Sequence, residues 1–163
     1  MMPTPSQTVG PFFGHALPYL HDWELVPEGH PEAITLAGRV FDGAGEPVPD
    51  ALLELWLGHT GDGGALRRGD GLTSGFGRCA TSPTGSYRFR TVRPAGPYLS
   101  VQVFARGLLR SLLTRVYLED RPDPLLDDLD PARRSTLIAT GSGDAYRFDV
   151  RLQGEGETVF LDF

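Results

Sequence analysis

The sequence predicts an all-β fold, and two features of its 163 residues support this prediction. Its 21 glycines and 14 prolines recur at short intervals, and between them lie runs of four to eight residues rich in Val, Leu, Phe, Tyr and Thr. Short strands separated by turns are typical of a two-sheet β-sandwich. Because no apolar run approaches the roughly 20 residues that a membrane-spanning helix needs, we expect one soluble domain.

The first expected strands lie at residues 34–41 and 51–57, on either side of the turn-rich segment 42–47. Their closeness in sequence predicts that they pair as a hairpin. Residues 58–77 are rich in glycine and polar side chains, so we expect one long surface loop there. Trp56, at the end of the second strand, is interpreted as a core or interface residue.

The later strands are expected at residues 87–92, 98–105 and 112–119. In residues 98–105 the period is two, which predicts one packed face and one available face. An acidic linker at 120–131 and a helical turn at 132–139 follow, and strands at 146–152 and 158–163 close the sandwich. The packed face of residues 98–105 would carry Leu99, Val101, Val103 and Ala105, and the other face Tyr98, Ser100, Gln102 and Phe104.

Residues 1–33 differ from the rest because their prolines and aromatic residues follow neither a helical nor a strand period. Such an arm cannot form a core of its own. It must cover another surface, since each large apolar side chain left in water costs roughly 1.5–3 kcal/mol. We therefore divide the chain into an arm, residues 1–33, that packs on a partner chain, and a sandwich, residues 34–163. The large apolar residues of the arm include Phe12, Phe13, Tyr19, Leu20 and Trp23.

Charge and cysteine content exclude several classes of protein. The formal net charge is −6, and the basic residues, all arginine, form no cluster larger than a pair, so no nucleic-acid footprint is visible. The single Cys79 cannot form an internal disulfide. The N-terminus lacks the pattern of a secretory signal, so we expect a cytoplasmic protein that is not bound to a membrane.

No pattern of catalytic or metal-binding residues can be derived from spacing alone. A hydrolytic triad needs a histidine near a nucleophile, and a zinc site needs three or four ligands at suitable spacing. The last 104 residues contain no histidine, and the adjacent acids Asp127 and Asp128 are interpreted as a solvated turn. We therefore assign no catalytic and no metal-ligating residue to this chain. Its histidines are His15, His21, His30 and His59.

Four segments, which together span nearly the whole chain, carry a resemblance to a known family. They are residues 4–12 (TPSQTVGPF), 53–56 (LELW), 104–107 (FARG) followed by 114–117 (TRVY), and the tail 146–163 (YRFDVRLQGEGETVFLDF). In these segments the chain resembles the alpha subunits of protocatechuate 3,4-dioxygenases, within the intradiol ring-cleavage dioxygenase family. The tail is the most specific of the four, because the first segment also marks the sister beta chains.

The resemblance implies a β-sandwich in each of two homologous chains and a non-haem ferric ion, Fe(III), held by two tyrosines and two histidines. In the catalytic beta chain the histidines form a His-x-His pair on one strand, where residues two apart reach the same metal. Alignment on residues 104–107 places Tyr98 and Ser100 at those positions. Alignment on Gly96 and Pro97 instead matches Tyr98 to a tyrosine ligand. In both registers most ligands are missing, which implies that the partner beta chain binds the iron.

The resemblance also implies that this chain contributes to a substrate pocket at the interface with the beta subunit. Carried over by position, Thr8, Gly10, Pro11 and Phe12 of the arm, together with Arg106, would face an aromatic acid. Arginine suits the carboxylate of protocatechuate (3,4-dihydroxybenzoate), and glycine allows close approach of the backbone. The expected function is therefore support of ring cleavage by O₂ to 3-carboxy-cis,cis-muconate.

Three alternatives remain open at this point. Arg106 would instead form an interchain salt bridge, or the whole chain would be a binding module that kept the fold and lost the chemistry. A homo-oligomeric enzyme would need an unrecognised set of iron ligands, for which His15, His21, His59 and Tyr98 are the candidates.

Overall fold

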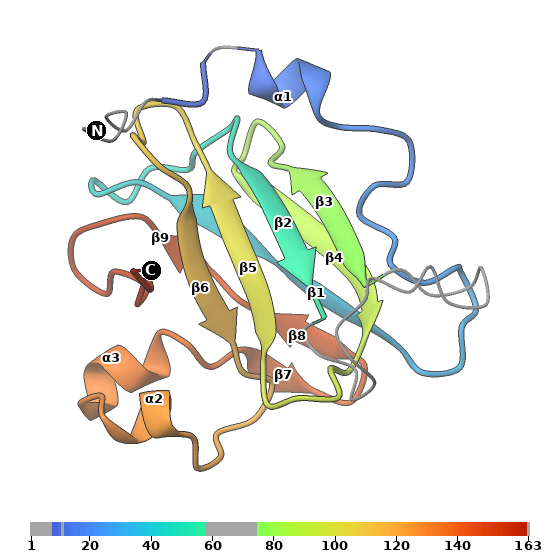
Figure 1. Cartoon of the computed structure of the whole chain (residues 1–163), viewed down its shortest axis with the longest axis vertical. Coiled ribbons are helices and arrows are strands. Elements are labelled where there is room, and N and C mark those ends of the chain that lie inside the picture. The colour runs from blue at the N-terminus through green and yellow to red at the C-terminus, as the bar shows by residue number, and fades with distance from the viewer. Residues whose placement is uncertain (1–7, 11, 58–74, 163) are drawn as a thin grey trace, which may run out of the picture.

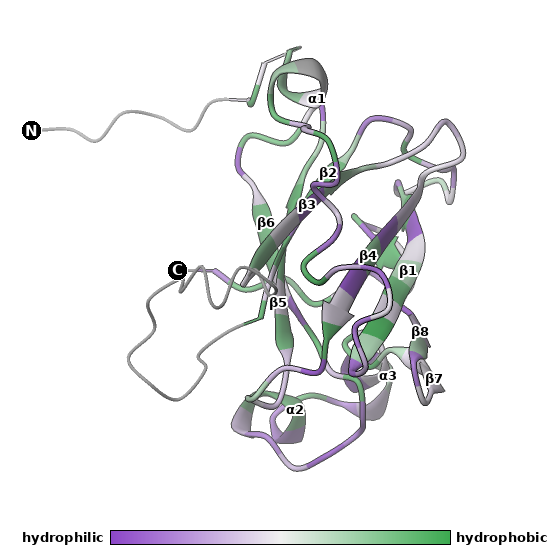
Figure 2. Cartoon of the chain, turned by 90° about the vertical axis from the view of Figure 1, so that its right-hand side faces the viewer, coloured by the Kyte–Doolittle hydropathy of each residue, from purple (hydrophilic) through white to green (hydrophobic). Residues whose placement is uncertain are grey.

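Two β-sheets packed face to face form the chain, which confirms the predicted sandwich (Figure 1, Figure 2). In this computed structural model, residues 8–10, 12–57 and 75–162 are described. One sheet has the strand order β4-β1-β8-β7, with β9 also paired to β1, and the other has the order β3-β2-β5-β6. The strands are β1 (Ala33–Phe41), β2 (Leu52–Trp56), β3 (Phe76–Ala80), β4 (Ser86–Val92), β5 (Leu99–Phe104), β6 (Leu112–Val116), β7 (Thr140–Ser142), β8 (Ala145–Arg147) and β9 (Val150–Arg151).

Three short helices lie at the two ends of the sandwich. Helix α1 (Phe13–Ala16) belongs to the arm and lies at one end, whereas α2 (Pro124–Asp127) and α3 (Pro131–Ser135) lie at the other (Figure 1). Both α2 and α3 begin with an aspartate followed by a proline. The side chains of Asp123 and Asp130 accept backbone hydrogen bonds from the first helical turns, as N-cap residues do. Within the described ranges, no helix has the length and apolar character needed to cross a membrane.

The predicted hairpin between the first two strands is wrong. Strand β1 pairs with β4 in one sheet, and β2 pairs with β3 and β5 in the other. The chain does reverse after β1, because Asp42 closes a tight turn and Val48 donates a backbone hydrogen bond to Val40. It then crosses to the second sheet before β2 begins. Turn residues predict that the chain reverses, but they do not predict which sheet the next strand joins.

Several predicted boundaries also change. The expected loop at 58–77 lies mostly outside the described residues, but its last two residues, Phe76 and Gly77, belong to β3. The expected strand at 146–152 is divided into β8 and β9. The tail at 158–163 forms no strand within its described part and has a single bridge, between Leu161 and Leu113. The linker at 120–131 contains α2, and the helical turn expected at 132–139 is the shorter α3.

The main core lies between the sheets, and a second cluster lies outside one of them. Strand β5 shows the predicted alternation, since Leu99, Val101 and Val103 are fully buried in the main core while the residues between them are half-buried. At the end nearest α2 and α3, a smaller apolar cluster covers the outer face of the β3-β2-β5-β6 sheet. Its buried members are Tyr117, Leu126, Leu137 and Val159.

The second half of the arm packs on the chain's own sandwich. Leu25 donates a backbone hydrogen bond to Arg90 in β4, and Arg78 in β3 donates one to Asp22. A Cβ atom on Gly77 would lie 2.3 Å from Cδ1 of Leu25, so only glycine leaves room for the arm here. The preceding part of the arm differs, because Phe12 is 74% exposed and Leu20 is 84% exposed, although Phe13 is buried.

Candidate functional site

The candidate substrate residue Arg106 lies immediately after β5, where the chain turns toward β6. Its side chain is 65% exposed, and its guanidinium forms an ion pair with the carboxylate of Asp50. Asp50 lies just before β2, the strand that pairs with β5. Asp50 of the same chain therefore orients the positive charge of Arg106, and this charge remains accessible to a ligand or a partner. Arginine in such a position can bind a carboxylate through two parallel hydrogen bonds.

Helix α1, which follows the described arm residues in sequence, lies at the same end of the sandwich as the β5–β6 turn (Figure 1). Thr8 and Phe12 are exposed and Gly10 is half-buried; Pro11 lies outside the described residues. Gly10 has a φ of +79°, a left-handed conformation that favours glycine. No hydrogen bond or ion pair joins Arg106 to the described residues of the arm. Their gathering around one ligand thus stays a prediction.

A second polar constellation lies at the opposite end of β5, around Tyr98. The guanidinium of Arg115, in β6, lies 4.0 Å from the centre of the Tyr98 ring, and the Tyr98 and Tyr117 rings are 5.7 Å apart. Arg115 also donates a 3.4 Å hydrogen bond to the Tyr117 hydroxyl. Eight residues separate Tyr98 from Arg106, which corresponds to roughly 26 Å along a strand. The two constellations are therefore separate.

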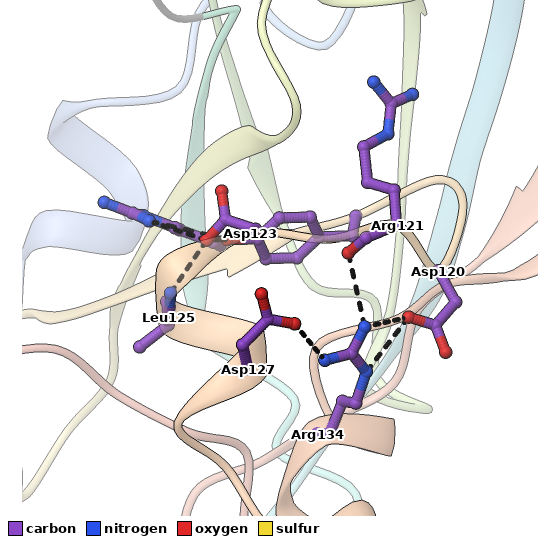
Figure 3. Close-up of polar contacts among 8 residues, drawn as sticks. Asp120, Arg121, Asp123, Leu125, Asp127 and Arg134 are labelled. Carbon is purple, nitrogen blue, oxygen red and sulfur yellow. Dashed lines mark hydrogen bonds and ion pairs between the residues drawn. The ribbon is translucent and has the colours of Figure 1, made fainter.

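Asp123 links this constellation to helix α2. It accepts a 2.8 Å hydrogen bond from the Tyr117 hydroxyl and a 3.0 Å bond from the Leu125 backbone nitrogen, which Figure 3 shows at the start of α2. Its carboxylate lies 3.7 Å from the Arg115 guanidinium. Because Asp123 is only 9% exposed, these partners compensate a charge that would otherwise be costly to bury.

A further ion-pair network holds α2 and α3 in place. Arg134 of α3 pairs with Asp127 of α2 at 3.2 Å and also with Asp120 (Figure 3). Asp127 is thus engaged in a structural contact. Asp128, its neighbour in the predicted solvated turn, is the C-cap of α2 and is exposed.

The charges around Tyr117 determine the protonation of the constellation. The pKa of Tyr117 is raised to about 12, mainly by burial; Arg115 opposes this shift, and the hydrogen bond to Asp123 adds to it. Burial acts to lower the pKa of Arg115, but Tyr117, Tyr98 and Asp123 together raise it. At neutral pH the phenol of Tyr117 is therefore neutral and the guanidinium of Arg115 is positive.

These residues do not fit a ferric ion. The two aligned positions offer a phenol and a hydroxyl, Tyr98 and Ser100, and a guanidinium lies against the first of them. The ferric site that the sequence resemblance implies uses tyrosines and histidines, whereas the described part of the chain contains no group of three or more His, Cys, Asp or Glu side chains able to hold a metal ion. His59 and the side chain of His15 lie outside what is described, so the alternative ligand set of His15, His21, His59 and Tyr98 stays a prediction.

Sequence reasoning overlooked Asp50, Arg115, Tyr117 and Asp123 as site residues. For Asp123 a signal was present, because aspartate before proline is a common start of a helix. Arg115 belongs to the motif at residues 114–117 (TRVY), but only the pairing of β5 with β6 brings it beside Tyr98 and Ser100.

Comparison with known proteins places this chain among dioxygenases. The Dioxygenase family model matches residues 8–102. The chain is 37% identical to the protocatechuate 3,4-dioxygenase alpha chain of Burkholderia cepacia, over 98% of this chain and 96% of that one. It is 36% identical to the alpha chain of the same name from Pseudomonas putida, with the same coverage.

A solved structure supports the same relationship. The dioxygenase domain of a dioxygenase–carbohydrate-binding fusion protein from Streptomyces sp. SirexAA-E superposes with a TM-score of 0.59 at 28% identity. The match covers 94% of this chain and 99% of that domain. The similarity therefore extends over the whole sandwich and not over a single motif.

Proposed function

Because this chain belongs to the intradiol ring-cleaving dioxygenase family, as a relative of its alpha chains, we propose that it is the alpha subunit of a protocatechuate 3,4-dioxygenase. With a beta subunit it would convert 3,4-dihydroxybenzoate and O₂ to 3-carboxy-cis,cis-muconate. The observation that carries this proposal is the similarity to alpha chains over nearly the full length of both sequences. An oxidoreductase subunit needs no complete active site of its own.

In this proposal Arg106 binds the carboxylate of the substrate. The ion pair with Asp50 holds the guanidinium at the β5–β6 turn, and the side chain is 65% exposed, which leaves donors available. The arm residues Thr8, Gly10, Pro11 and Phe12 form the adjoining wall of the pocket. Together they would orient the ring and exclude water, while the catechol oxygens point toward the partner chain.

The beta subunit is proposed to cover the exposed part of the arm between Phe12 and Leu20. Leu20, Phe12 and Tyr19 are 84%, 74% and 54% exposed, which is a large apolar surface for one short segment. The second half of the arm is anchored by backbone hydrogen bonds to β3 and β4, so the apolar part has a defined starting point. Association would bury these side chains.

Iron is proposed to reside in the beta subunit, where it supplies the activation of substrate and O₂ for ring opening. The described residues of this chain do not offer a ligand set for it. Purification of this chain alone and together with the beta chain tests the assignment. Iron, visible colour and ring cleavage are expected only in the pair. Iron and activity in the lone chain would refute it, and a pair that never associates would favour a binding module.

The substrate role of Arg106 is tested in the assembled enzyme. Arg106→Ala is expected to raise KM for protocatechuate by about 10- to 100-fold, since hydrogen bonds to charged groups contribute about 1.5–3 kcal/mol. KM for catechol, which lacks the carboxylate, should change much less. Arg110→Ala is the matched control, because Arg110 lies in the same turn and pairs with Asp162. Equal losses for both substrates would exclude charge pairing, and failure to assemble would favour an interchain salt bridge.

A further inference from the structure

Tyr98 and Ser100 lie on the outer face of the β3-β2-β5-β6 sheet. Leu99 and Val101 are fully buried between the sheets, so the residues that alternate with them lie on the outer face. This is the face on which the family's catalytic chains are expected to hold their histidine pair. Tyr98 stands at a ligand position in both sequence registers considered above.

Arg115 reaches both of these positions. In the antiparallel pairing of β5 with β6, Arg115 is the direct partner of Ser100. Directly opposed residues have Cβ atoms roughly 5 Å apart. From there the guanidinium extends over the ring of Tyr98, at 4.0 Å from its centre. One side chain thus borders the two positions at which the histidines would stand in the alignment on residues 104–107.

The guanidinium is held in this place from the side of α2. Tyr117 accepts a hydrogen bond from Arg115, and Asp123, 3.7 Å from the guanidinium, accepts a hydrogen bond from Tyr117 in turn. Asp123 is itself fixed as the N-cap of α2, through its bond to Leu125. Only 27% of the Arg115 side chain is exposed. Two phenols and one carboxylate therefore surround a single organic cation.

We propose that the guanidinium of Arg115 stands in for the metal ion in this chain and excludes a metal cation from the outer face of β5 and β6. Two positive charges cannot share this space without strong repulsion, and the one already present is covalently part of the fold. The outer face thus still holds a positive charge between aromatic rings and a carboxylate. Unlike a metal ion, however, this guanidinium cannot coordinate a substrate or O₂. This inference rests on the family's ligand positions and not on the substrate or the partner.

The test builds the missing ligands and asks whether Arg115 still blocks metal. Tyr98→His and Ser100→His together would place a His-x-His pair on the outer face, and imidazole pairs suit Zn²⁺. This double variant is prepared as the full chain with Arg115 and with Arg115→Gln. Zn²⁺ binding is measured by isothermal titration calorimetry without substrate or partner. Loss of the guanidinium should strengthen binding about tenfold or more, because a unit charge and a doubly charged ion roughly 5 Å apart repel each other by more than one tenfold step even in water.

Three further variants separate charge from other causes. Arg115→Met removes the charge and should act like Arg115→Gln, whereas Arg115→Lys keeps the charge and should leave binding weak. Arg121→Gln is the matched control for net charge; its side chain is 46% exposed and pairs with Glu119, so it should not strengthen binding. Equal Zn²⁺ affinity with arginine and with the neutral residues would overturn the proposal. Loss of the fold in both neutral variants would also overturn it, because Arg115 would then be required for structure.

Because the readout is Zn²⁺ affinity of this chain alone, it is independent of the proposed enzyme. The pair could fail to cleave protocatechuate while Arg115 still excludes metal. Conversely, if Arg115 had no effect on Zn²⁺ binding, the proposed function of the chain as an alpha subunit would still stand.

Discussion

Replacement of Arg78 by methionine is expected to destabilise the chain and to release the arm. Arg78, in β3, donates to the carboxylate of Glu54 in β2 through Nε at 3.0 Å, and it also donates to the backbone carbonyl of Leu17 at 2.9 Å. The Glu54 side chain is 11% exposed and that of Arg78 is 18% exposed. The pair therefore fastens the arm to the sheet and is nearly removed from water.

The expected loss of stability follows from the carboxylate of Glu54, which remains charged after Arg78 is replaced. Arg78→Met leaves Glu54 buried without its cation, and removal of one partner of a buried ion pair costs about 3–5 kcal/mol. This is a large part of the roughly 5–15 kcal/mol by which a typical domain is stable. Glu54→Met combined with Arg78→Met removes both charges, so most of the lost stability should return.

Urea unfolding of the full chain, followed by circular dichroism, measures these free energies. The matched control is Arg110→Met, because the Arg110 side chain is 63% exposed and its ion pair with Asp162 lies in solvent. Its cost should stay below about 1 kcal/mol. The reasoning would be refuted if Arg78→Met cost as little as this control, or if the double variant were as unstable as the single one.

Three other changes test the packing, the capping and the pH dependence. Gly38→Ala should cost about 3 kcal/mol in urea unfolding, because a Cβ there would lie 1.8 Å from the carbonyl oxygen of Phe148. Asp130→Ala should cost about 1 kcal/mol, with Asp130→Asn close to wild type, because this side chain caps α3. Tyr117 has a folded pKa raised from 10.0 to about 12, mainly by burial, so the unfolding free energy should fall by up to roughly 3 kcal/mol as the pH rises from 10 to 12. Tyr117→Phe should flatten the fall of unfolding free energy over that range, and an unchanged slope would contradict the assignment.

Much of the strand content could be predicted because it depends on local pattern. The alternation in residues 98–105 places β5 and its buried face correctly, and Asp before Pro marks the starts of α2 and α3. The pattern failed where partners decide the structure. Trp56 is half-buried, and its ring centre lies 4.5 Å from that of Phe76, with the two rings tilted against each other. Phe76 belongs to β3, a strand that was not predicted because the segment before it is rich in glycine.

The fold class and the family could be predicted from local patterns, because turn residues, strand period and motif order can be read along the chain. The placement of β1 and β2 in opposite sheets could not, since strand pairing joins residues far apart in sequence. The same is true of Arg115, whose contact with Tyr98 depends on the register between β5 and β6. A charge that appears in the sequence as one of fifteen arginines becomes, through that register, the cation of a buried constellation.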